Sequence, residues 1–226
     1  MDKECEGLCL TLCFYQYLTE ESKRIIDVLN TPSLTNLIAF DFNSPNANRL
    51  GYYDVTNDVI HIKADLVPFA LKEWLELKRI ADSSKKYFLE LEQPITSHLS
   101  TLLRVLCHEL KHREQHFHLT QQNEAEFLYE SQLDLNNPDD YKKYLELSIE
   151  IDAEAFGYLG ASYLLNEFFN LDSTYYFNIG SLCEKYVKRI HSLFTKYKSK
   201  FIDYRGAIFE KKYKAMLNRL LEYLEQ

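Results

Sequence analysis

A long apolar run after Pro94 limits the possible folds more than any other segment of the chain. The proline ends the preceding segment, and Thr96 or Ser97 can cap a new helix. The pattern then predicts a largely buried helix, which carries His108 and His112. Its apolar residues recur at three- and four-residue spacing, at Leu99, Leu102, Leu103, Val105, Leu106 and Leu110.

Around this helix the sequence predicts an α+β fold that is mostly helical. The chain has only six Gly and five Pro in 226 residues, too few for the many turns of a sandwich or barrel. β-Branched and aromatic residues at 35–42 and 51–63 indicate a small antiparallel sheet near residues 35–63, with a hairpin turn between Val55 and Val59. We expect this sheet to pack on the helix that carries the histidines.

The second half of the chain is predicted to be almost entirely helical. Residues 120–137 are polar, which indicates a partly helical connection or a loop. Asn137 before Pro138 is typical of a helix start, and one long helix is expected from Asp139 to about Phe169.

Two C-terminal helices are expected beyond this point, at about 180–199 and 201–225. We interpret residues 1–226 as a single domain, with a core at about 50–160 and C-terminal helices at about 180–225.

Charge and hydropathy exclude some classes of function. The net charge of −8 argues against a nucleic-acid binder, because phosphate contacts need clustered Lys and Arg. No run approaches the roughly 18 apolar residues of a membrane span. The acidic start of the chain lacks the basic residues of a signal peptide. We therefore expect a cytoplasmic protein, or a viral protein that acts in the host cytoplasm.

The cysteines are expected to be free thiols, as in a reducing compartment. Cys5, Cys9 and Cys13 recur every four residues and would lie along one helix face. Their spacing does not match a paired zinc motif, so small buried side chains are the favoured interpretation and their role stays open.

The segment His108-Glu109-Leu110-Lys111-His112 predicts a metal site. On a helix the two histidines are separated by roughly 6 Å of rise and about 40° of rotation, so both imidazoles can reach one ion. Glu109 points about 100° away from His108, which suits a general base beside a bound water better than a ligand. Two imidazoles and a carboxylate on a buried helix are costly unless they are coordinated or paired.

A catalytic zinc takes three protein ligands and a water, so a third ligand is needed. His118 stands at the spacing of the metzincin motif, but Gln115 occupies the position where that motif needs a glycine to turn the chain. On a continuing helix His118 would lie about 15 Å from His108. Glu150, in Ile149-Glu150-Ile151-Asp152-Ala153-Glu154, is the better candidate.

The two motifs together resemble the gluzincin metallopeptidases, including the reduced intracellular minigluzincins, over about Leu50 to Gly160. The resemblance implies that Glu150 is the third zinc ligand and that Glu154 orients a motif histidine from behind. Glu150 and Glu154 share a helix face, which agrees with these roles. Glu146 on the same face and the neighbouring Asp152 remain rivals as ligands.

The resemblance also implies an edge strand beside the active-site helix, and Asp58 to Lys63 is the expected segment. Such an edge would bind an extended peptide as an added strand. His61 on this strand faces either the cleft or, more commonly for a strand histidine, solvent. No residue stands out as an oxyanion stabiliser, and the candidates are Tyr158, His191, Tyr204 and Arg205.

The sequence thus predicts a zinc metallopeptidase with one Zn²⁺ per chain, held by His108, His112 and Glu150. Glu109 would act as general base toward a metal-activated water and would later return the proton to the leaving amine. The alternative is a catalytically silent zinc protein that binds or regulates a partner. The expected partner is a peptide or protein substrate, while substrate-binding residues, cleavage specificity and oligomeric state stay open.

Overall fold

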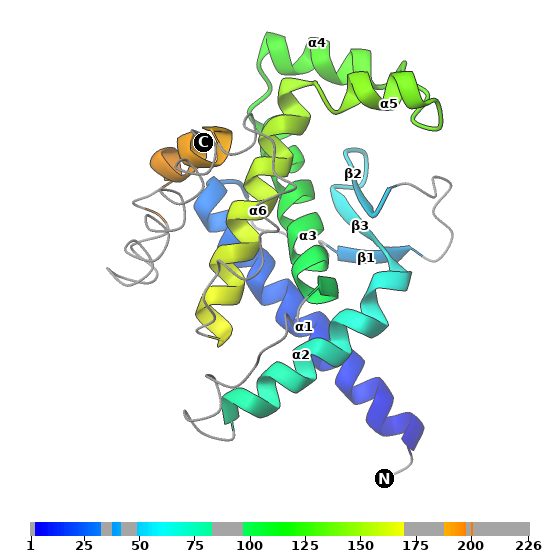
Figure 1. Cartoon of the computed structure of the whole chain (residues 1–226), viewed down its shortest axis with the longest axis vertical. Coiled ribbons are helices and arrows are strands. Elements are labelled where there is room, and N and C mark those ends of the chain that lie inside the picture. The colour runs from blue at the N-terminus through cyan, green and yellow to red at the C-terminus, as the bar shows by residue number, and fades with distance from the viewer. Residues whose placement is uncertain are drawn as a thin grey trace, which may run out of the picture.

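The structure of the chain is a computed structural model that describes residues 3–32, 38–41, 49–82, 97–169, 188–197 and 200 (Figure 1). The elements in chain order are α1 (Lys3–Leu29), β1 (Ile38–Asp41), β2 (Gly51–Asp54), β3 (Val59–Lys63), the short 3₁₀ helix η1 (Ala64–Leu66), α2 (Val67–Asp82), α3 (Ser97–Phe117), α4 (Gln121–Glu130), α5 (Pro138–Tyr144) and α6 (Ser148–Phe169). Residues 188–197 form a further helical segment.

The expected α+β class with mostly helical content is confirmed. Strands β2 and β3 form the expected antiparallel hairpin, in which Tyr53 pairs with Ile60. Strand β1 joins β3 in parallel, with Ile38 opposite Ile60, so the sheet order is β1-β3-β2 and the sheet is mixed rather than wholly antiparallel. The sheet packs on α3, as the sequence predicted.

Helices α3 and α6 run antiparallel through the middle of the molecule and form its core (Figure 1). Two glycines of α6 allow this close approach. A Cβ at Gly157 would lie 2.9 Å from the Arg104 carbonyl oxygen, and one at Gly160 would lie 2.6 Å from Cys107 Sγ. Because real Cβ contacts are longer, any larger residue at either position would push the helices apart.

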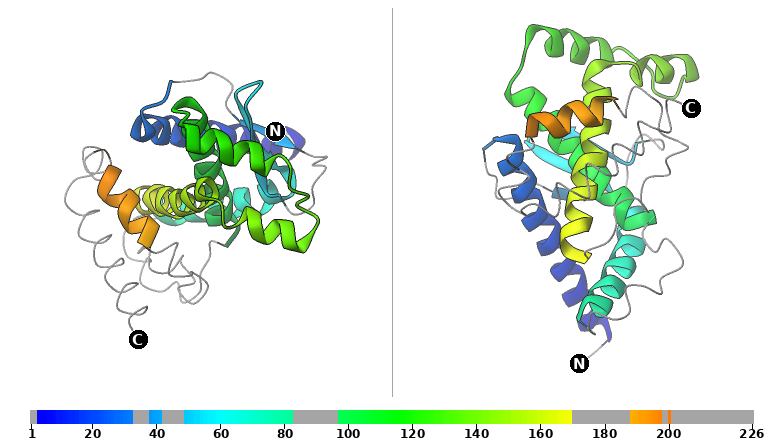
Figure 2. Two further views of the ribbon diagram at one scale, coloured as in Figure 1. Left: turned by 90° about the horizontal axis from the view of Figure 1, so that it is seen from above. Right: turned by 60° about the vertical axis from the view of Figure 1, so that its left-hand side comes forward.

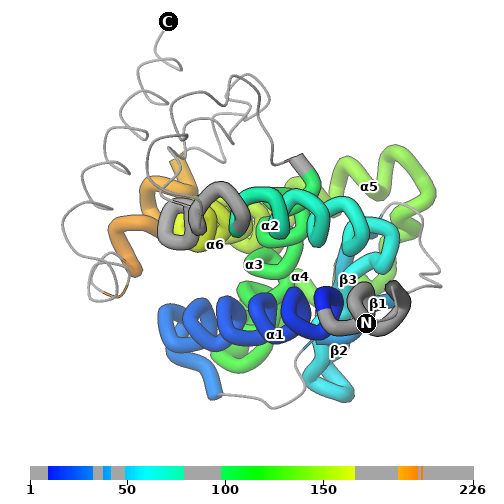
Figure 3. The backbone as a smooth tube through the Cα atoms, turned by 90° about the horizontal axis from the view of Figure 1, so that it is seen from below, coloured from blue at the N-terminus to red at the C-terminus, as the bar shows by residue number. Residues whose placement is uncertain are grey.

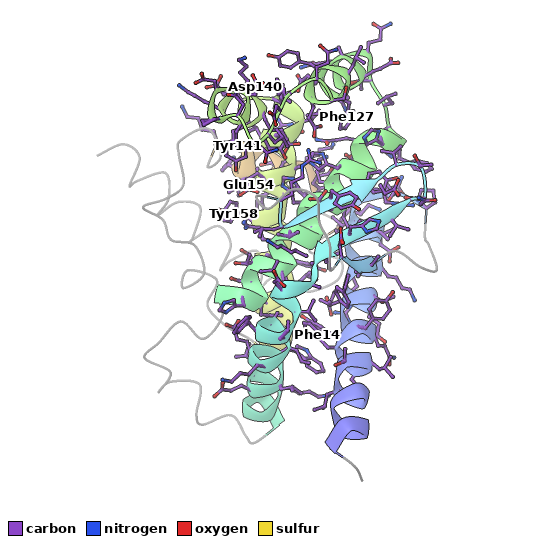
Figure 4. The ribbon with its side chains drawn as sticks, turned by 90° about the vertical axis from the view of Figure 1, so that its right-hand side faces the viewer. Phe14, Phe127, Asp140, Tyr141, Glu154 and Tyr158 are labelled. Carbon is purple, nitrogen blue, oxygen red and sulfur yellow. The ribbon has the colours of Figure 1, made fainter. Side chains whose placement is uncertain are left out.

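Helices α1 and α2 lie on either side of α3 when the molecule is viewed from below (Figure 3). The interface between them is aromatic: the Phe14 ring of α1 lies 5.4 Å from the Trp74 ring of α2, and both side chains are buried (Figure 4). Aromatic pairs at this distance add to the free energy gained by burying their area. The N-terminal end of α3 is therefore held between two helices.

A buried arginine fixes the β2–β3 hairpin to α3. Arg113 Nε donates to Asp58 Oδ1 at 2.7 Å, and its Nη1 donates to Thr31 Oγ1 at 2.9 Å, beyond the end of α1. Asp58 takes a left-handed backbone conformation in the turn, with φ of 52°. Burying a guanidinium is costly without such partners, so this network determines where the hairpin lies on α3.

The helical segment at 188–197 is attached to both core helices. Arg189 Nη2 donates to Asp152 Oδ2 of α6 at 2.7 Å. Lys111 of α3 donates to Tyr197 Oη at 3.2 Å and to Glu114 at 2.6 Å. The segment confirms part of the helix expected at 180–199, while the helix expected at 201–225 lies outside the described residues.

The long helix expected from Asp139 to Phe169 is wrong. Helix α5 ends at Tyr144, and α6 begins only at Ser148. Helices α4 and α5 instead form a layer across the end of the α3–α6 pair (Figure 2). Neither α4 nor α5 contains a buried residue.

Candidate metal centre

The N-terminus of α3 is fixed by a glutamate from α2. Glu73 Oε2 accepts a hydrogen bond from the Leu99 backbone N–H at 2.8 Å, and Glu73 Oε1 lies 2.9 Å from His98 Nδ1. The first turn of a helix has free N–H groups, and a carboxylate satisfies them and complements the helix dipole. This contact helps to fix the position of α3, and with it that of the two histidines, relative to α2.

The N-terminus of α6 is fixed in the same way, by Glu126 of α4. Glu126 accepts hydrogen bonds from Ser148 Oγ at 2.6 Å and from the Ile149 backbone N–H at 3.0 Å. Partial burial alone would raise the pKa of Glu126, but these donors lower it. The contact explains why a new helix starts at Ser148, and it places Glu150 in the first turn of α6.

His108, His112 and Glu150 meet between the two helices. The Nε2 atoms of His108 and His112 are 3.0 Å apart, Glu150 Oε1 lies 3.1 Å from His112 Nε2, and Glu150 Oε2 lies 3.5 Å from His108 Nε2. One ligand atom from each residue lies within 4.8 Å of the others. Ligands at zinc distances of about 2.05 Å in a tetrahedron are about 3.3 Å apart, so the group matches the spacing of a zinc site.

The chemistry of the three side chains also fits a cation. Glu150 Oε1 is buried, and no described group makes a hydrogen bond of normal geometry with it. Although burial raises the pKa of the Glu150 carboxyl, the facing His112 and His108 hold that pKa well below its usual range. A buried anion that faces two imidazole nitrogens provides the mixed nitrogen and oxygen ligand set that zinc prefers.

Each histidine has a partner on its other nitrogen. His108 Nδ1 lies 3.3 Å from Glu154 Oε2, and the other oxygen of Glu154 accepts from Arg104. His112 Nδ1 lies 2.9 Å from Gln115 Oε1. Partners of this kind orient metal-bound histidines, and Glu154 contacts a motif histidine as the resemblance implied, while its role toward a metal stays a prediction. Sequence reasoning missed Arg104 and Gln115 as parts of the site.

The rival ligands are placed elsewhere. Glu146 is exposed in the connection before α6, and Asp152 pairs with Arg189. His118 follows the last residue of α3 and is exposed, in agreement with the prediction that it does not join His108 and His112 as a ligand. Among the described residues, only His108, His112 and Glu150 form a group able to hold a metal.

Glu109 is a buried carboxylate that belongs to the site but not to the ligand group. Its side chain lines the cleft beside His108 and Glu150, and it is 6% exposed. Burial raises its pKa, while the neighbouring His108 and His112 lower it, and burial prevails. Glu109 thus lies beside the histidines without joining their ligand group, and its role as general base stays a prediction.

Tyr144, which sequence reasoning missed, faces the same cleft from the end of α5. Desolvation of the phenol in the cleft and the charge of Glu150 raise its pKa well above the usual value, so the hydroxyl stays protonated. The guanidinium of Arg49 lies 5.9 Å from the centre of its ring. A protonated phenol beside Glu109 and Glu150 is a hydrogen-bond donor at the site.

Of the four oxyanion candidates named from sequence, the two that the structure describes, Tyr158 and His191, do not line the cleft. The Arg104 guanidinium lies 5.2 Å from the centre of the Tyr158 ring. Figure 4 shows Tyr158 one turn beyond Glu154 on α6. His191 is exposed on the 188–197 segment. Tyr204 and Arg205 lie outside the described residues.

A cleft of about 180 Å³ opens between β2, α3 and the α5–α6 connection. Strand β2 is its rim: a Cβ at Gly51 would lie 2.6 Å from Val105 Cγ1 and 3.5 Å from Glu109 Cγ, so only glycine allows this approach. The cleft mixes charged site residues with an apolar wall. The wall is made of Leu50, Val105, Leu135, Tyr141, Tyr144 and Leu145.

The strand expected at the edge was misassigned. Residues 59–63 form β3, which is the central strand, and β2 is the edge strand beside the site. His61 stacks on Tyr52 with ring centres 4.5 Å apart. The alternating burial of β3 puts His61 on the face opposite Ile60 and Ile62, away from α3. His61 therefore does not face the cleft.

Cys13 is exposed, so the interpretation of this cysteine as a small buried side chain is wrong. Cys107 is fully buried, and burial raises the pKa of its thiol. The side chains of Cys5 and Cys9 lie outside the described residues. Cys107 packs against Gly160 at the α3–α6 interface, in agreement with its predicted place in the core.

No family model, curated protein or solved structure matches the chain. The described helices include none that is both long enough and apolar enough to cross a membrane.

Proposed function

We propose that the chain is a zinc-dependent metallopeptidase of the gluzincin type that acts in the cytoplasm. The observation that supports this most strongly is the meeting of His108, His112 and Glu150 from two helices at the spacing of a zinc tetrahedron. A purely structural zinc site usually has four protein ligands, whereas this group offers three and opens onto a cleft. This difference favours a catalytic role over a silent one.

When bound, zinc would polarise a substrate carbonyl and acidify a water molecule at the open position. Glu109, whose pKa is raised by burial, is placed to accept the proton of that water and to pass it to the leaving amine. Glu154 contacts His108 at Nδ1, the nitrogen that does not face Glu150, and Arg104 donates a hydrogen bond to Glu154. These contacts keep the ligand imidazole in one orientation through the reaction.

Tyr144 is the proposed donor to the charge that develops on the substrate carbonyl oxygen. Its raised pKa keeps the phenol proton available, and it lines the same cleft as Glu109. A fixed donor at a developing oxyanion contributes a large part of the catalytic effect in acyl transfer. Tyr144 takes the role for which the sequence offered only Tyr158, His191, Tyr204 and Arg205.

The proposed substrate is an extended peptide that lies along β2. Only one side of β2 pairs with a described strand, β3, so its other side offers backbone groups to an added strand. Because Gly51 brings β2 against Val105 and Glu109, a peptide bound there would pass next to the general base.

Metal removal tests this proposal. The zinc-loaded protein is expected to cleave members of a mixture of short unstructured peptides, to lose this activity with 1,10-phenanthroline, and to regain it when about one equivalent of Zn²⁺ is added back. Mass spectrometry of the peptide mixture is the measurement. Cleavage that survives complete removal of zinc would contradict the proposal, and a zinc-loaded protein without any cleavage would favour the silent alternative.

A further inference from the structure

Gln115 connects a proposed zinc ligand to the helix that carries the third ligand. It lies on α3 three residues after His112, and its side chain is among the buried polar groups, with 4% exposure. Its Oε1 is 2.9 Å from His112 Nδ1, and its Nε2 donates to the Ile149 carbonyl oxygen at 2.9 Å. Ile149 directly precedes Glu150 on α6.

The Ile149 carbonyl determines which way the Gln115 amide faces. A carbonyl oxygen only accepts hydrogen bonds, so the amide NH₂ of Gln115 must point at it. The amide oxygen must then face His112, which makes Nδ1 of His112 the donor. A neutral imidazole with its proton on Nδ1 has the lone pair on Nε2, the atom that faces His108 and Glu150.

We propose that Gln115 is a positioning residue that holds His112 in its metal-binding tautomer and ties this histidine to the first turn of α6. The inference rests on the proposed zinc site. One amide thereby aligns ligands on two helices, because its acceptor fixes His112 and its donor fixes the backbone next to Glu150.

The neutral charge of the amide is part of the argument. Glu109, Glu150 and Glu154 already gather at the site, and Glu154 is the carboxylate partner of His108 Nδ1. A fourth carboxylate at 115 would keep an acceptor for His112 but would face the Ile149 carbonyl without a proton to donate. Glutamine is the residue that supplies both an acceptor and a donor without adding charge.

The test compares Gln115→Met with Gln115→Glu. Methionine has nearly the same length and keeps the packing, but it makes neither hydrogen bond. We expect Gln115→Met to bind zinc about 10- to 100-fold more weakly than wild type, as when outer partners of ligands are removed. Gln115→Glu keeps only the acceptor for His112, so its zinc affinity should lie between those of wild type and Gln115→Met. Competition with a chromophoric chelator measures the zinc affinity, and Gln132→Met is the matched control at an exposed glutamine.

A second measurement separates positioning from a general loss of structure. In the zinc-loaded protein the Nδ1 proton of His112 should give a slowly exchanging NMR signal, because Gln115 accepts it. The signal should persist in Gln115→Glu and be lost to exchange in Gln115→Met, while the His108 Nδ1 signal, held by Glu154, remains in both.

The outcomes distinguish this inference from the proposed function. If wild type binds zinc but Gln115→Met keeps both the wild-type affinity and the His112 signal, the inference is overturned and the zinc site stands. If wild type binds no zinc, the proposed function is overturned together with the inference.

Discussion

Glu109→Gln is expected to lower kcat strongly while the protein still binds zinc. The amide cannot accept a proton from water, and general-base catalysis typically accelerates a reaction by about 100- to 10,000-fold. We therefore expect kcat to decrease by a factor in that range. The substitution keeps the size of a side chain that is 6% exposed and lies outside the ligand group. The kcat on a cleaved peptide and the zinc content of the same sample are the two measurements.

Glu146→Gln is the matched control, because Glu146 is an exposed glutamate four residues before Glu150. It should retain both zinc and activity. Hydrolysis by Glu109→Gln at the wild-type rate would rule out Glu109 as the general base. Loss of zinc from Glu109→Gln would instead mean that Glu109 holds the ion.

Glu150→Gln is expected to show the opposite pattern, with loss of zinc as its first effect. Zinc is bound by carboxylate oxygens and imidazole nitrogens, and an amide oxygen is a much weaker ligand. Because outer partners alone account for about 10- to 100-fold in metal affinity, removing a ligand should weaken binding by more than about 100-fold. Titration with zinc against a competing chelator is the measurement.

The Glu146→Gln control serves this comparison too, since both residues belong to the same stretch of chain and both were considered as ligands. Circular dichroism of the two variants shows whether each remains folded. Wild-type zinc affinity in folded Glu150→Gln would exclude Glu150 as a ligand and would leave the two histidines without a third ligand.

The sequence predicted the parts of the fold that depend on local pattern. The apolar spacing from Leu99 to Leu110 gave α3, and the turn before Val59 gave the hairpin. The strand order depends on whether β1 pairs with β2 or with β3, and no local sequence pattern determines this long-range pairing. For this reason the hairpin was predicted and the edge strand was misassigned.

The break between α5 and α6 shows the same limit. Leu145, Glu146 and Leu147 are all good helix formers, so the sequence favoured one continuous helix. The new start at Ser148 is stabilised by Glu126, which lies on a different helix. A distant capping residue outweighs local propensity here.

The site residues that belong to one of the two recognised motifs were predicted, and those outside the motifs were missed. Spacing gave His108 and His112, and the structure brings Glu150 and Glu154 to them. Gln115 lies three residues after His112, so helical spacing could have revealed it. Tyr144 could not be predicted from sequence, because its place at the site depends on the end of α5 at Tyr144 and the new start of α6 at Ser148.

Direct measurement of the bound metal tests the zinc site itself. Protein purified without a histidine tag and incubated with Zn²⁺ should carry about one zinc per chain, the content of a single mononuclear site. Crystals measured at the zinc absorption edge should show the ion between His108, His112 and Glu150. Less than about 0.2 zinc per folded chain, or an ion held by other residues, would contradict the account.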